Sequence, residues 1–250
     1  MNQYGLEASE ASMRARKTAM AKRLLDIALS SISLVVLSPL FGLAAIGIRL
    51  SSPGPIFYRA QRVGVNQTKF VMYKFRTMHV DRRSLTSVIT AKNDPRVFVL
   101  GLWLRRLKID ELPQLLNVLR GEMAIVGPRP EDPRIVGECY AQEHFETLCV
   151  LPGLASPGSI YNYTHGEQML DTDDPEKAYV ERLLPIKLAL DIVYVREASL
   201  IYDLRIIFRT ALTILAITLG KRHFADPPEM KKAQALVYPV KDRGASTAGS

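Results

Sequence analysis

Two adjacent carboxylates, Asp110 and Glu111, are the residues of this chain best suited to chemistry on a phosphate group. A carboxylate can attack phosphorus while a second one holds a hard divalent cation, and cationic neighbours attract the phosphate. The pair follows three such neighbours, Arg105, Arg106 and Lys108. A structural role suits the pair as well, because Asp is a favoured helix N-cap and Glu complements the dipole of a first helical turn. The local sequence leaves both interpretations open.

Four more basic residues are candidates for phosphate contacts. Arg129 stands in a Gly-Pro-Arg-Pro tetrapeptide, where two prolines leave the flanking backbone little freedom. Lys74 and Arg76 fall on one face of a predicted strand, and Arg96 follows an Asn-Asp-Pro turn. A rigid structural turn explains the tetrapeptide equally well, and solvated surface charge explains the other three.

Many other activities are excluded by what the sequence lacks. It contains no G-x-S-x-G, P-loop, dinucleotide-binding or H-E-x-x-H signature. The four histidines are scattered, and Cys139, His144 and Cys149 lack the spacing of a zinc site. Only two cysteines among 250 residues exclude a disulfide scaffold and indicate a reducing compartment. A hydrophobic fraction of 48% excludes a disordered chain.

The net charge of +8 is concentrated in one part of the chain. Residues 49–129 hold fifteen Lys and Arg against five acids, whereas residues 130–250 hold thirteen basic and seventeen acidic residues. A local cationic excess indicates an anionic ligand or surface at that place. The carboxylate pair lies within this cationic block.

The longest apolar run, IALSSISLVVLSPLFGLAAIGI, is long enough to cross a membrane by length alone. Pro39 lies near its midpoint beside Ser38 and cannot donate to the Val35 carbonyl, so the helix should break there. Basic residues flank both ends, and they favour the cytoplasmic side at each end. We therefore predict a re-entrant helix-break-helix over 21–50, in which serines bond back to freed carbonyls. A kinked full span is the alternative.

The rest of the chain predicts an α+β fold, with a small, mixed but mainly helical cytoplasmic domain and amphipathic interfacial helices. Two strands are expected at 56–62 and 69–77, and a short helix at ELPQLLNVLRG, where Gly121 is the stop. Further helices are expected at 134–150, 175–196 and 199–219. The expected domains are a polar leader at 1–20, the membrane hairpin at 21–50, the cytoplasmic domain at 51–220 and a flexible tail at 221–250.

Taken in chain order, several stretches resemble one family, the bacterial sugar transferases that are monotopic phosphoglycosyl transferases acting on polyprenyl phosphate. They extend from about Lys22 to Leu219 and read KRLLDIALSSISLVVLSPLF, GPIFYRAQRVG, FVMYKFRTM, NDPRV, LRRLKIDELPQLLNVLRGEMAIVGPRP and KLALDIVYVREASLIYDLRIIFRT. No single piece is specific, but the ordered set is. The resemblance implies a minimal, single-hairpin member whose catalytic domain is residues 51–220.

The resemblance implies a role for each candidate residue. Asp110 would be the nucleophile that attacks the β-phosphate of a UDP-sugar, and Glu111 would bind Mg²⁺. Arg105 and Arg129 match arginines that organise the carboxylates and the phosphates. Ser38 and Pro39 match the break of the re-entrant membrane helix. The expected substrate- and phosphate-binding set is Lys74, Arg76, Arg96, Arg105, Gln114 and Arg129.

The implied reaction releases UMP and moves the phosphosugar from a UDP-sugar to a polyprenyl phosphate such as undecaprenyl phosphate. This step initiates exopolysaccharide, O-antigen or glycoconjugate synthesis at the bacterial inner membrane, with the catalytic domain facing the cytoplasm. Expected partners are the UDP-sugar, the polyprenyl phosphate and membrane lipid, with no nucleic acid and with a homo-oligomer left open.

Two stretches depart from the family pattern. Arg-Leu-Lys-Ile at 106–109 replaces a run rich in Thr and Ser before the carboxylates, and PGLASPGSIYNYTHGE at 152–167 replaces another family motif. Contacts in these stretches are not carried over, so the sugar and the pathway stay open.

Two other functions compete with this interpretation. One is a non-catalytic, membrane-anchored basic module that binds anionic lipid or nucleic acid. It gives no reason for two carboxylates inside the cationic block. The other is a polytopic phosphosugar transferase, which would need many spans where this chain has one long apolar run. Release of UMP from a UDP-sugar in the presence of lipid phosphate separates the transferase from the binding module.

Overall fold

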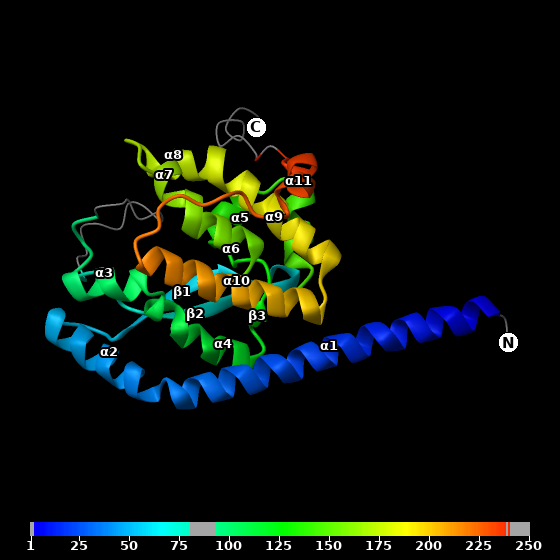
Figure 1. The fold of residues 1–250 in the computed structure, drawn as a ribbon, viewed down its shortest axis with the longest axis horizontal. Helices are drawn as coiled ribbons and strands as arrows, with labels where there is room; N and C mark the ends of the chain where they lie inside the picture. The colour runs from blue at the N-terminus through cyan, green and yellow to red at the C-terminus, as the bar shows by residue number, and fades with distance from the viewer. Residues whose placement is uncertain (1–2, 81–93, 239, 241–250) are drawn as a thin grey trace, which may run out of the picture.

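The computed structural model describes residues 3–80, 94–238 and 240 of the chain (Figure 1). The α-helices in this part are α1 (Gln3–Val36), α2 (Ser38–Ser51), α3 (Val99–Arg106), α4 (Leu115–Arg120), α5 (Pro133–Cys139), α6 (Pro157–Tyr161), α7 (Glu167–Met169), α8 (Pro175–Ala178), α9 (Leu184–Glu197), α10 (Leu200–Thr218) and α11 (Met230–Ala233). The strands are β1 (Phe57–Val63), β2 (Lys69–Phe75), β3 (Ala124–Val126) and β4 (Gly153–Ala155). The predicted α+β class with mainly helical content is confirmed.

The apolar run folds as two helices with a break, as predicted. α1 ends at Val36 and α2 begins at Ser38, and the two helices are bent by 60°. Pro39 has no N–H for the Val35 carbonyl, and the Ser38 hydroxyl donates to that carbonyl instead, at 2.8 Å. Among the described residues no single helix is long and apolar enough to cross a membrane, but this bent pair passes that test together. The leader expected at 1–20 has no boundary of its own, because α1 runs unbroken through residue 20.

Three polar side chains fasten α1 to the rest of the molecule, where it passes along α4 and β3 (Figure 1). The Arg23 guanidinium donates to the carbonyls of Val118 and Leu119 at the end of α4, at 2.6 and 3.0 Å. Lys22 pairs with the buried Asp203 of α10 at 2.5 Å. Asp26, one turn further along α1, accepts from the backbone N–H of Ile125 in β3 at 3.1 Å. These contacts fix the start of the hairpin relative to the site described below.

β1 and β2 form an antiparallel hairpin, as predicted, with Phe57 opposite Phe75 and Val63 opposite Lys69. The open edge of β2 is covered by one side chain of α4. The Asn117 amide donates to the Val71 carbonyl at 2.7 Å and accepts from the Tyr73 N–H at 3.1 Å. These two bonds satisfy backbone groups that would otherwise lack partners, and they place α4 and the segment before it against β2.

β3 and β4 form a short parallel pair with Ala124 opposite Gly153. Gly153 approaches Gly127 so closely that a Cβ on Gly153 would lie 2.1 Å from the Gly127 nitrogen. No larger residue fits at this crossing, and the approach sets the direction in which the chain leaves β3 toward Pro128 and Arg129. The Gly-Pro-Arg-Pro tetrapeptide is therefore held by strand pairing at its first residue.

The C-terminal half differs from expectation in two places. The helix predicted over 134–150 is divided into α5 and a 3₁₀ helix (Gln142–Leu148), and the helix predicted over 175–196 contains a π-helical turn (Tyr179–Leu183) between α8 and α9. Pro185 lies in the first turn of α9, directly after this π-helical turn. The remaining short segments are 3₁₀ helices (Val65–Gln67, Ile109–Gln114 and Gln234–Leu236) and a π helix (Asn162–Gly166).

Part of the expected flexible tail is packed on the domain. Within 221–238, Met230 and Ala233 of α11 join the core beside α9. Glu229 accepts from Arg209 at 2.5 Å and from the Tyr202 hydroxyl at 2.8 Å, which ties this segment to α10. Sequence polarity suggested a tail, whereas two apolar residues and one ion pair suffice to dock it. Residues 239 and 241–250 lie outside the described residues.

Candidate active site

Asp110 and Glu111 lie in the 3₁₀ helix Ile109–Gln114, which follows α3 and packs against β2. The preceding residue, Lys108, has a left-handed backbone with φ of 56° and forms the N-terminal boundary of this helix. Among the described residues no side chain caps this helix by a hydrogen bond, so Asp110 is not its N-cap. Both carboxylates do lie in the first turn, as the dipole interpretation expects, and their side chains are available for other contacts.

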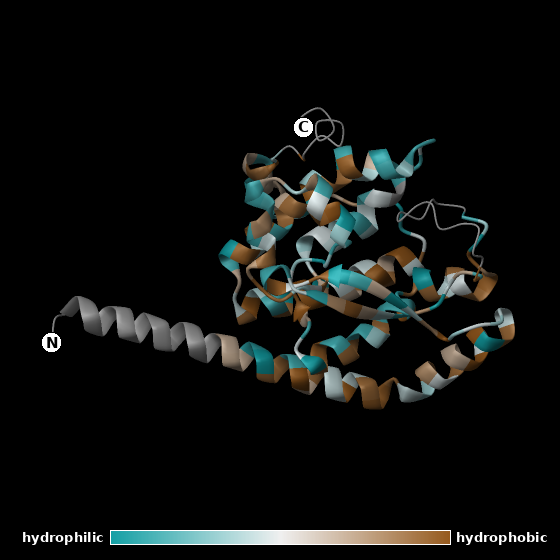
Figure 2. Ribbon diagram, turned by 180° about the vertical axis from the view of Figure 1, so that it is seen from behind, coloured by the Kyte–Doolittle hydropathy of each residue, from teal (hydrophilic) through white to brown (hydrophobic). Residues whose placement is uncertain are grey.

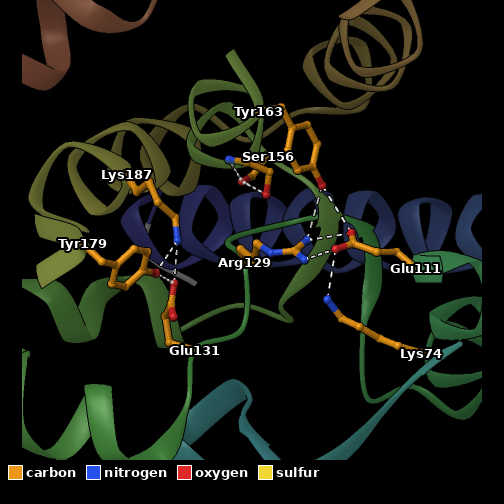
Figure 3. Close-up of polar contacts among 9 residues, drawn as sticks. Lys74, Glu111, Arg129, Glu131, Ser156, Tyr163, Tyr179 and Lys187 are labelled. Carbon is orange, nitrogen blue, oxygen red and sulfur yellow. Dashed lines mark hydrogen bonds and ion pairs between the residues drawn. The ribbon is translucent and has the colours of Figure 1, made fainter. Parts of the chain in front are cut away.

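Glu111 is surrounded by donors from three distant parts of the chain (Figure 3). Arg129 binds it in a bidentate manner, with Nη1 at 3.0 Å from Oε2 and Nη2 on Oε1. Lys74 Nζ lies 3.0 Å from Oε1, and the Tyr163 hydroxyl donates to Oε2 at 3.3 Å. Burial raises the pKa of Glu111, but Arg129, Lys74 and Lys108 outweigh it and hold that pKa well below its ordinary value. Glu111 is a fixed anion.

Asp110 has the opposite surroundings. Its side chain is buried, with 7% of the residue exposed, and its Oδ1 has no hydrogen-bond partner among the described residues. Burial, together with the negative charge of Glu111, raises the pKa of Asp110 above its ordinary value, although Lys74, Lys108 and Arg105 oppose that shift. A carboxylate that is held among cations but is not hydrogen-bonded keeps its lone pairs free for an incoming electrophile.

Lys108 is a further cation beside the two carboxylates, on the side where Tyr163 lies. Its ammonium lies 3.8 Å from the centre of the Tyr163 ring, a cation–π geometry. Burial lowers the pKa of Lys108, while Glu111 and Asp110 oppose the shift. Two lysines and one arginine therefore face two carboxylates, which leaves an excess of positive charge for a bound anion.

The donor set of the site is small for the Mg²⁺ that the family resemblance implies. The described residues contain no group of three or more His, Cys, Asp or Glu side chains close enough to form a closed metal site. Mg²⁺ commonly uses one or two carboxylates together with waters and substrate phosphates. The unpartnered Asp110 oxygen and the adjacent Glu111 match that smaller donor set, so the residues fit a magnesium ion shared with a phosphate ligand.

The other predicted residues are divided between the site and its surroundings. Arg105 is near the carboxylates and donates through Nε to the Thr77 hydroxyl at 2.8 Å. Gln114, on the same 3₁₀ helix, is fully buried, and neither atom of its amide group has a partner among the described residues. Arg96 binds Asp94 at 2.5 Å, and the charges of both lie near Arg105.

Arg76 is not in the cluster. It follows the last residue of β2, and its guanidinium donates to Ser52, Pro53 and Pro55, with distances of 2.6 to 3.0 Å. Lys74 reaches Glu111 instead, so the two side chains do not converge on one site, although the Arg76 N–H still donates to the Ile56 carbonyl across the hairpin at 2.8 Å. Arg76 holds the loop that follows α2.

Two residues of the site were not predicted. Tyr163 contacts Glu111 from the segment 152–167 that departs from the family pattern. Asp191 of α9 is buried and accepts from the backbone N–H groups of Gly158 and Arg129 at 2.9 and 3.3 Å, which positions Arg129 from behind. Burial raises the pKa of Asp191 to about 6. No local pattern marks either residue, since each acts only through long-range contacts.

Lys74 and Arg129 form a clamp on Glu111. A polar pocket of about 250 Å³ opens beside this clamp. Its far wall carries Glu131, whose Oε1 accepts from Lys187 and from the Tyr179 hydroxyl, each at 2.6 Å (Figure 3). Asn162 also lines it. Hydroxyl, amide and charged groups thus face one cavity next to the carboxylates, a lining that suits a polar ligand.

Comparison with known proteins identifies the family. The family model described as bacterial sugar transferase matches residues 17–217. The chain belongs to the bacterial sugar transferase family. The matched range includes most of the bent helix pair α1–α2, the two carboxylates, Arg129 and nearly all of α10.

Curated relatives of this sugar transferase carry related names. The chain is 40% identical over 197 residues to an undecaprenyl-phosphate glucose phosphotransferase of Komagataeibacter xylinus, covering 76% of this chain and 35% of the relative. It is 38% identical over 206 residues to the exopolysaccharide production protein PSS of Rhizobium leguminosarum bv. phaseoli, covering 80% and 96%. A UDP-N-acetylgalactosamine-undecaprenyl-phosphate N-acetylgalactosaminephosphotransferase of Aeromonas hydrophila is 35% identical over 199 residues, covering 79% and 44%. The chain spans little more than a third of the length of the first of these relatives.

Proposed function

We propose that this sugar transferase moves a sugar 1-phosphate from a UDP-sugar to a polyprenyl phosphate at the bacterial inner membrane, releasing UMP. Relatives named for glucose and for N-acetylgalactosamine transfer to undecaprenyl phosphate support the reaction class and leave the sugar open. The observation that carries the proposal is the contrast within the carboxylate pair. Asp110 has a free, buried oxygen, whereas its neighbour Glu111 is fixed by three donors.

In the first step the Asp110 carboxylate attacks the β-phosphorus of the UDP-sugar. An aspartyl–phosphorus bond forms, the bond from that phosphorus to the bridging oxygen breaks, and UMP leaves with its electron pair. Lys74, Arg129 and Lys108 supply positive charge on the side where the phosphate must sit, which lowers the repulsion between two anions. Glu111, with Asp110 beside it, would hold Mg²⁺, and that ion would supply positive charge for a phosphate leaving group.

In the second step an oxygen of the polyprenyl phosphate attacks the same phosphorus. The aspartyl bond breaks, the Asp110 carboxylate is regenerated, and the product is a polyprenyl diphosphosugar. The pKa of Asp110 is raised by burial, yet it stays ionisable because Lys74, Lys108 and Arg105 oppose the shift. The group is therefore a stronger nucleophile than an ordinary aspartate and remains a competent leaving group.

The proposed location at the membrane rests on the bent helix pair α1–α2. Exposed apolar side chains follow both of its arms, at Leu24, Ile32, Val35, Val36, Leu43, Ile46 and Leu50. Figure 2 shows that hydrophobic residues occupy much of both helices near the break. The bent pair meets a length and composition test for membrane insertion that neither helix meets alone. We propose that it enters and leaves the bilayer on the cytoplasmic face, so the carboxylates meet a substrate that is held in the membrane.

A product assay tests the function. Purified protein is supplied with Mg²⁺, undecaprenyl phosphate and a panel of UDP-sugars, and both UMP and the lipid-linked sugar are measured. We expect both products with at least one sugar, and loss of both in Asp110→Asn. The matched control is Asp173→Asn, at an exposed loop position, which should keep full activity. Binding of anionic vesicles without UMP release from any sugar would favour the non-catalytic module instead.

A further inference from the structure

A second pocket lies where the end of α10 meets α3. It has a volume of about 370 Å³, and the described residues that line it include the basic residues Arg106, Lys221, Arg222 and His223 and no acid. Their side chains are exposed or half-buried, so the pocket opens to the surface. A concave, cationic lining of this kind concentrates an anionic ligand.

The pocket is separated from the carboxylates by one side chain. Tyr163 lines it, and the hydroxyl of the same residue donates to Glu111 Oε2 at 3.3 Å. The Lys108 ammonium lies on the Tyr163 ring and adds positive charge at this boundary. An anion in the pocket would therefore be next to the reacting centre without occupying the clamp formed by Lys74 and Arg129.

The end of α10 does not oppose an anion there, although a helix C-terminus ordinarily does. Its last carbonyls are all bonded: Leu215, Ala216 and Ile217 accept from the backbone N–H groups of residues 219, 221 and 220. Thr218 accepts from Arg106 Nη2 at 3.1 Å, which also brings the basic end of α3 to this place. The pocket consequently presents donors rather than free carbonyls.

Exposed apolar side chains lie near the lining residues Arg106 and Ile217 in the chain, at the ends of α3 and α10. Leu215 and Leu219 are exposed on the last turns of α10, with 79% of Leu219 accessible. Trp103 and Leu107 are exposed at the end of α3, and the Arg106 guanidinium lies 5.8 Å from the centre of the Trp103 ring. A free phosphate gains nothing from this surface, whereas an anion attached to a hydrocarbon chain gains burial of apolar area along both helix ends.

We propose that this pocket binds the phosphate head of the isoprenoid lipid acceptor, with the first isoprene units along Trp103, Leu107, Leu215 and Leu219. The inference rests on the proposed function, because it gives the second substrate of that reaction a place of its own. The UDP-sugar uses the clamp at Lys74 and Arg129. The acceptor phosphate binds in the second pocket, on the side of Tyr163 that faces away from Glu111.

The test separates the two half-reactions. The double variant Lys221→Gln, Arg222→Gln removes two charges of the pocket and leaves intact the backbone carbonyl of Arg222, which accepts from Gln168. We expect KM for undecaprenyl phosphate to rise about tenfold or more, the loss typical of charge-assisted contacts. The single-turnover release of UMP without lipid should stay within about twofold of the parent, because the clamp is unaltered. Arg205→Gln with Lys231→Gln removes the same charge at exposed positions outside the pocket and is the matched control.

Binding is measured independently of activity. Trp103 is the only tryptophan in the sequence, so its fluorescence reports on this opening. Titration with undecaprenyl phosphate in detergent micelles should change the Trp103 emission in the parent and the control, and the change should require a much higher concentration in the double variant. Undecaprenol, which lacks the phosphate, and inorganic phosphate, which lacks the chain, should each bind far more weakly.

Three results would overturn the inference. A rise in KM for the UDP-sugar, or loss of UMP release in the double variant, would assign the pocket to the nucleotide. An equal rise in KM in the charge-matched control would show that the basic residues act only by attracting the protein to anionic membranes. Equal titration by inorganic phosphate would make it a simple anion site. Failure of the proposed function is distinguishable, since it would abolish UMP release in the parent while the phosphate-dependent change at Trp103 persisted.

Discussion

Asp110 and Glu111 are neighbours in the chain with contrasting electrostatic settings. Glu111 receives donors from Arg129, Lys74 and Tyr163, and its pKa is held far below the ordinary value. Asp110 is buried without a partner for Oδ1, and its pKa is raised. Environments that push the pKa values of paired acids apart assign them different tasks. In the proposed reaction Glu111 would organise the cations and Asp110 would be the nucleophile.

The first prediction for a single residue concerns the bidentate contact of Arg129 with Glu111. Arg129→Lys keeps the charge but replaces two planar contacts on Glu111 by one. Loss of a charge-assisted contact of this kind costs about 1.5–3 kcal/mol, so UMP release should fall about ten- to a hundredfold. Arg134→Lys, which loosens a surface pair with Glu176, is the matched control and should keep parental rates. Full activity in Arg129→Ala would show that the tetrapeptide is only a structural turn.

The second prediction concerns pH. Attack needs ionised Asp110, so the rate of UMP release falls as pH decreases through the raised pKa of that group. Lys108 lowers this pKa, and its removal in Lys108→Gln should raise it further. The acid limb of the pH–rate profile should then move to higher pH, with the greatest loss of rate at the acidic end. Lys69→Gln, at an exposed position on β2, should leave the profile unchanged. A shift of the limb to lower pH in Lys108→Gln would contradict the assignment.

At the scale of elements, the sequence predicted those whose signals are local. The β1–β2 hairpin, α10 and the break at Pro39 follow from alternation, helical periodicity and the missing proline N–H. The division of 134–150 and the π turn before α9 do not follow, because they are set by packing around α9. The docking of 221–238 depends on an ion pair between Glu229 and Arg209, which a polar composition conceals.

The prediction at this scale concerns the hairpin. Replacement of Ser38-Pro39 by Ala-Leu restores an N–H for the Val35 carbonyl and removes the hydroxyl that now bonds it. The two arms should then continue as one helix long enough to span the bilayer. Single cysteines at Ala15 and Pro55, in a Cys149→Ser background that leaves only the buried Cys139, report the side of each end.

In the parent, both reporter cysteines should be labelled only from the cytoplasm. In the Ala-Leu variant, labelling of the residue 15 cysteine should move toward the periplasmic side. Periplasmic labelling of that cysteine in the parent would establish a full span and exclude the re-entrant arrangement. Total membrane-bound protein, measured in both backgrounds, controls for failed insertion.

At the scale of the whole molecule, the site is assembled from segments that no local pattern connects. Glu111 meets Arg129 across 18 residues, Lys74 across 37 and Tyr163 across 52. The sequence predicted the carboxylates, Lys74 and Arg129 individually, from residue type and from the family resemblance. It could not predict that Arg129 and Lys74 converge on Glu111 rather than on Asp110, nor that Tyr163 completes the set. Nor could it predict that the Arg76 guanidinium binds the loop after α2 and not the site of Lys74.

The order in which the two substrates react is also a property of the whole enzyme. If Asp110 reacts first, UMP leaves before the lipid acts, and the kinetics are ping-pong with respect to UDP-sugar and polyprenyl phosphate. If the lipid phosphate attacked the UDP-sugar directly, both substrates would have to be bound together, and Asp110 would only orient them. The two routes give the same products, so product analysis alone does not separate them.

The most direct test is the intact mass of the protein after exposure to UDP-sugar and Mg²⁺ without lipid. We predict an added phosphosugar mass, equimolar release of UMP, assignment of the adduct to Asp110, and its removal when undecaprenyl phosphate is added. Asp110→Asn, which keeps the size of the side chain, should show no adduct and no turnover while its thermal unfolding stays close to that of the parent. Sequential kinetics with no adduct in the parent, together with near-normal turnover in Asp110→Asn, would contradict the covalent role of Asp110.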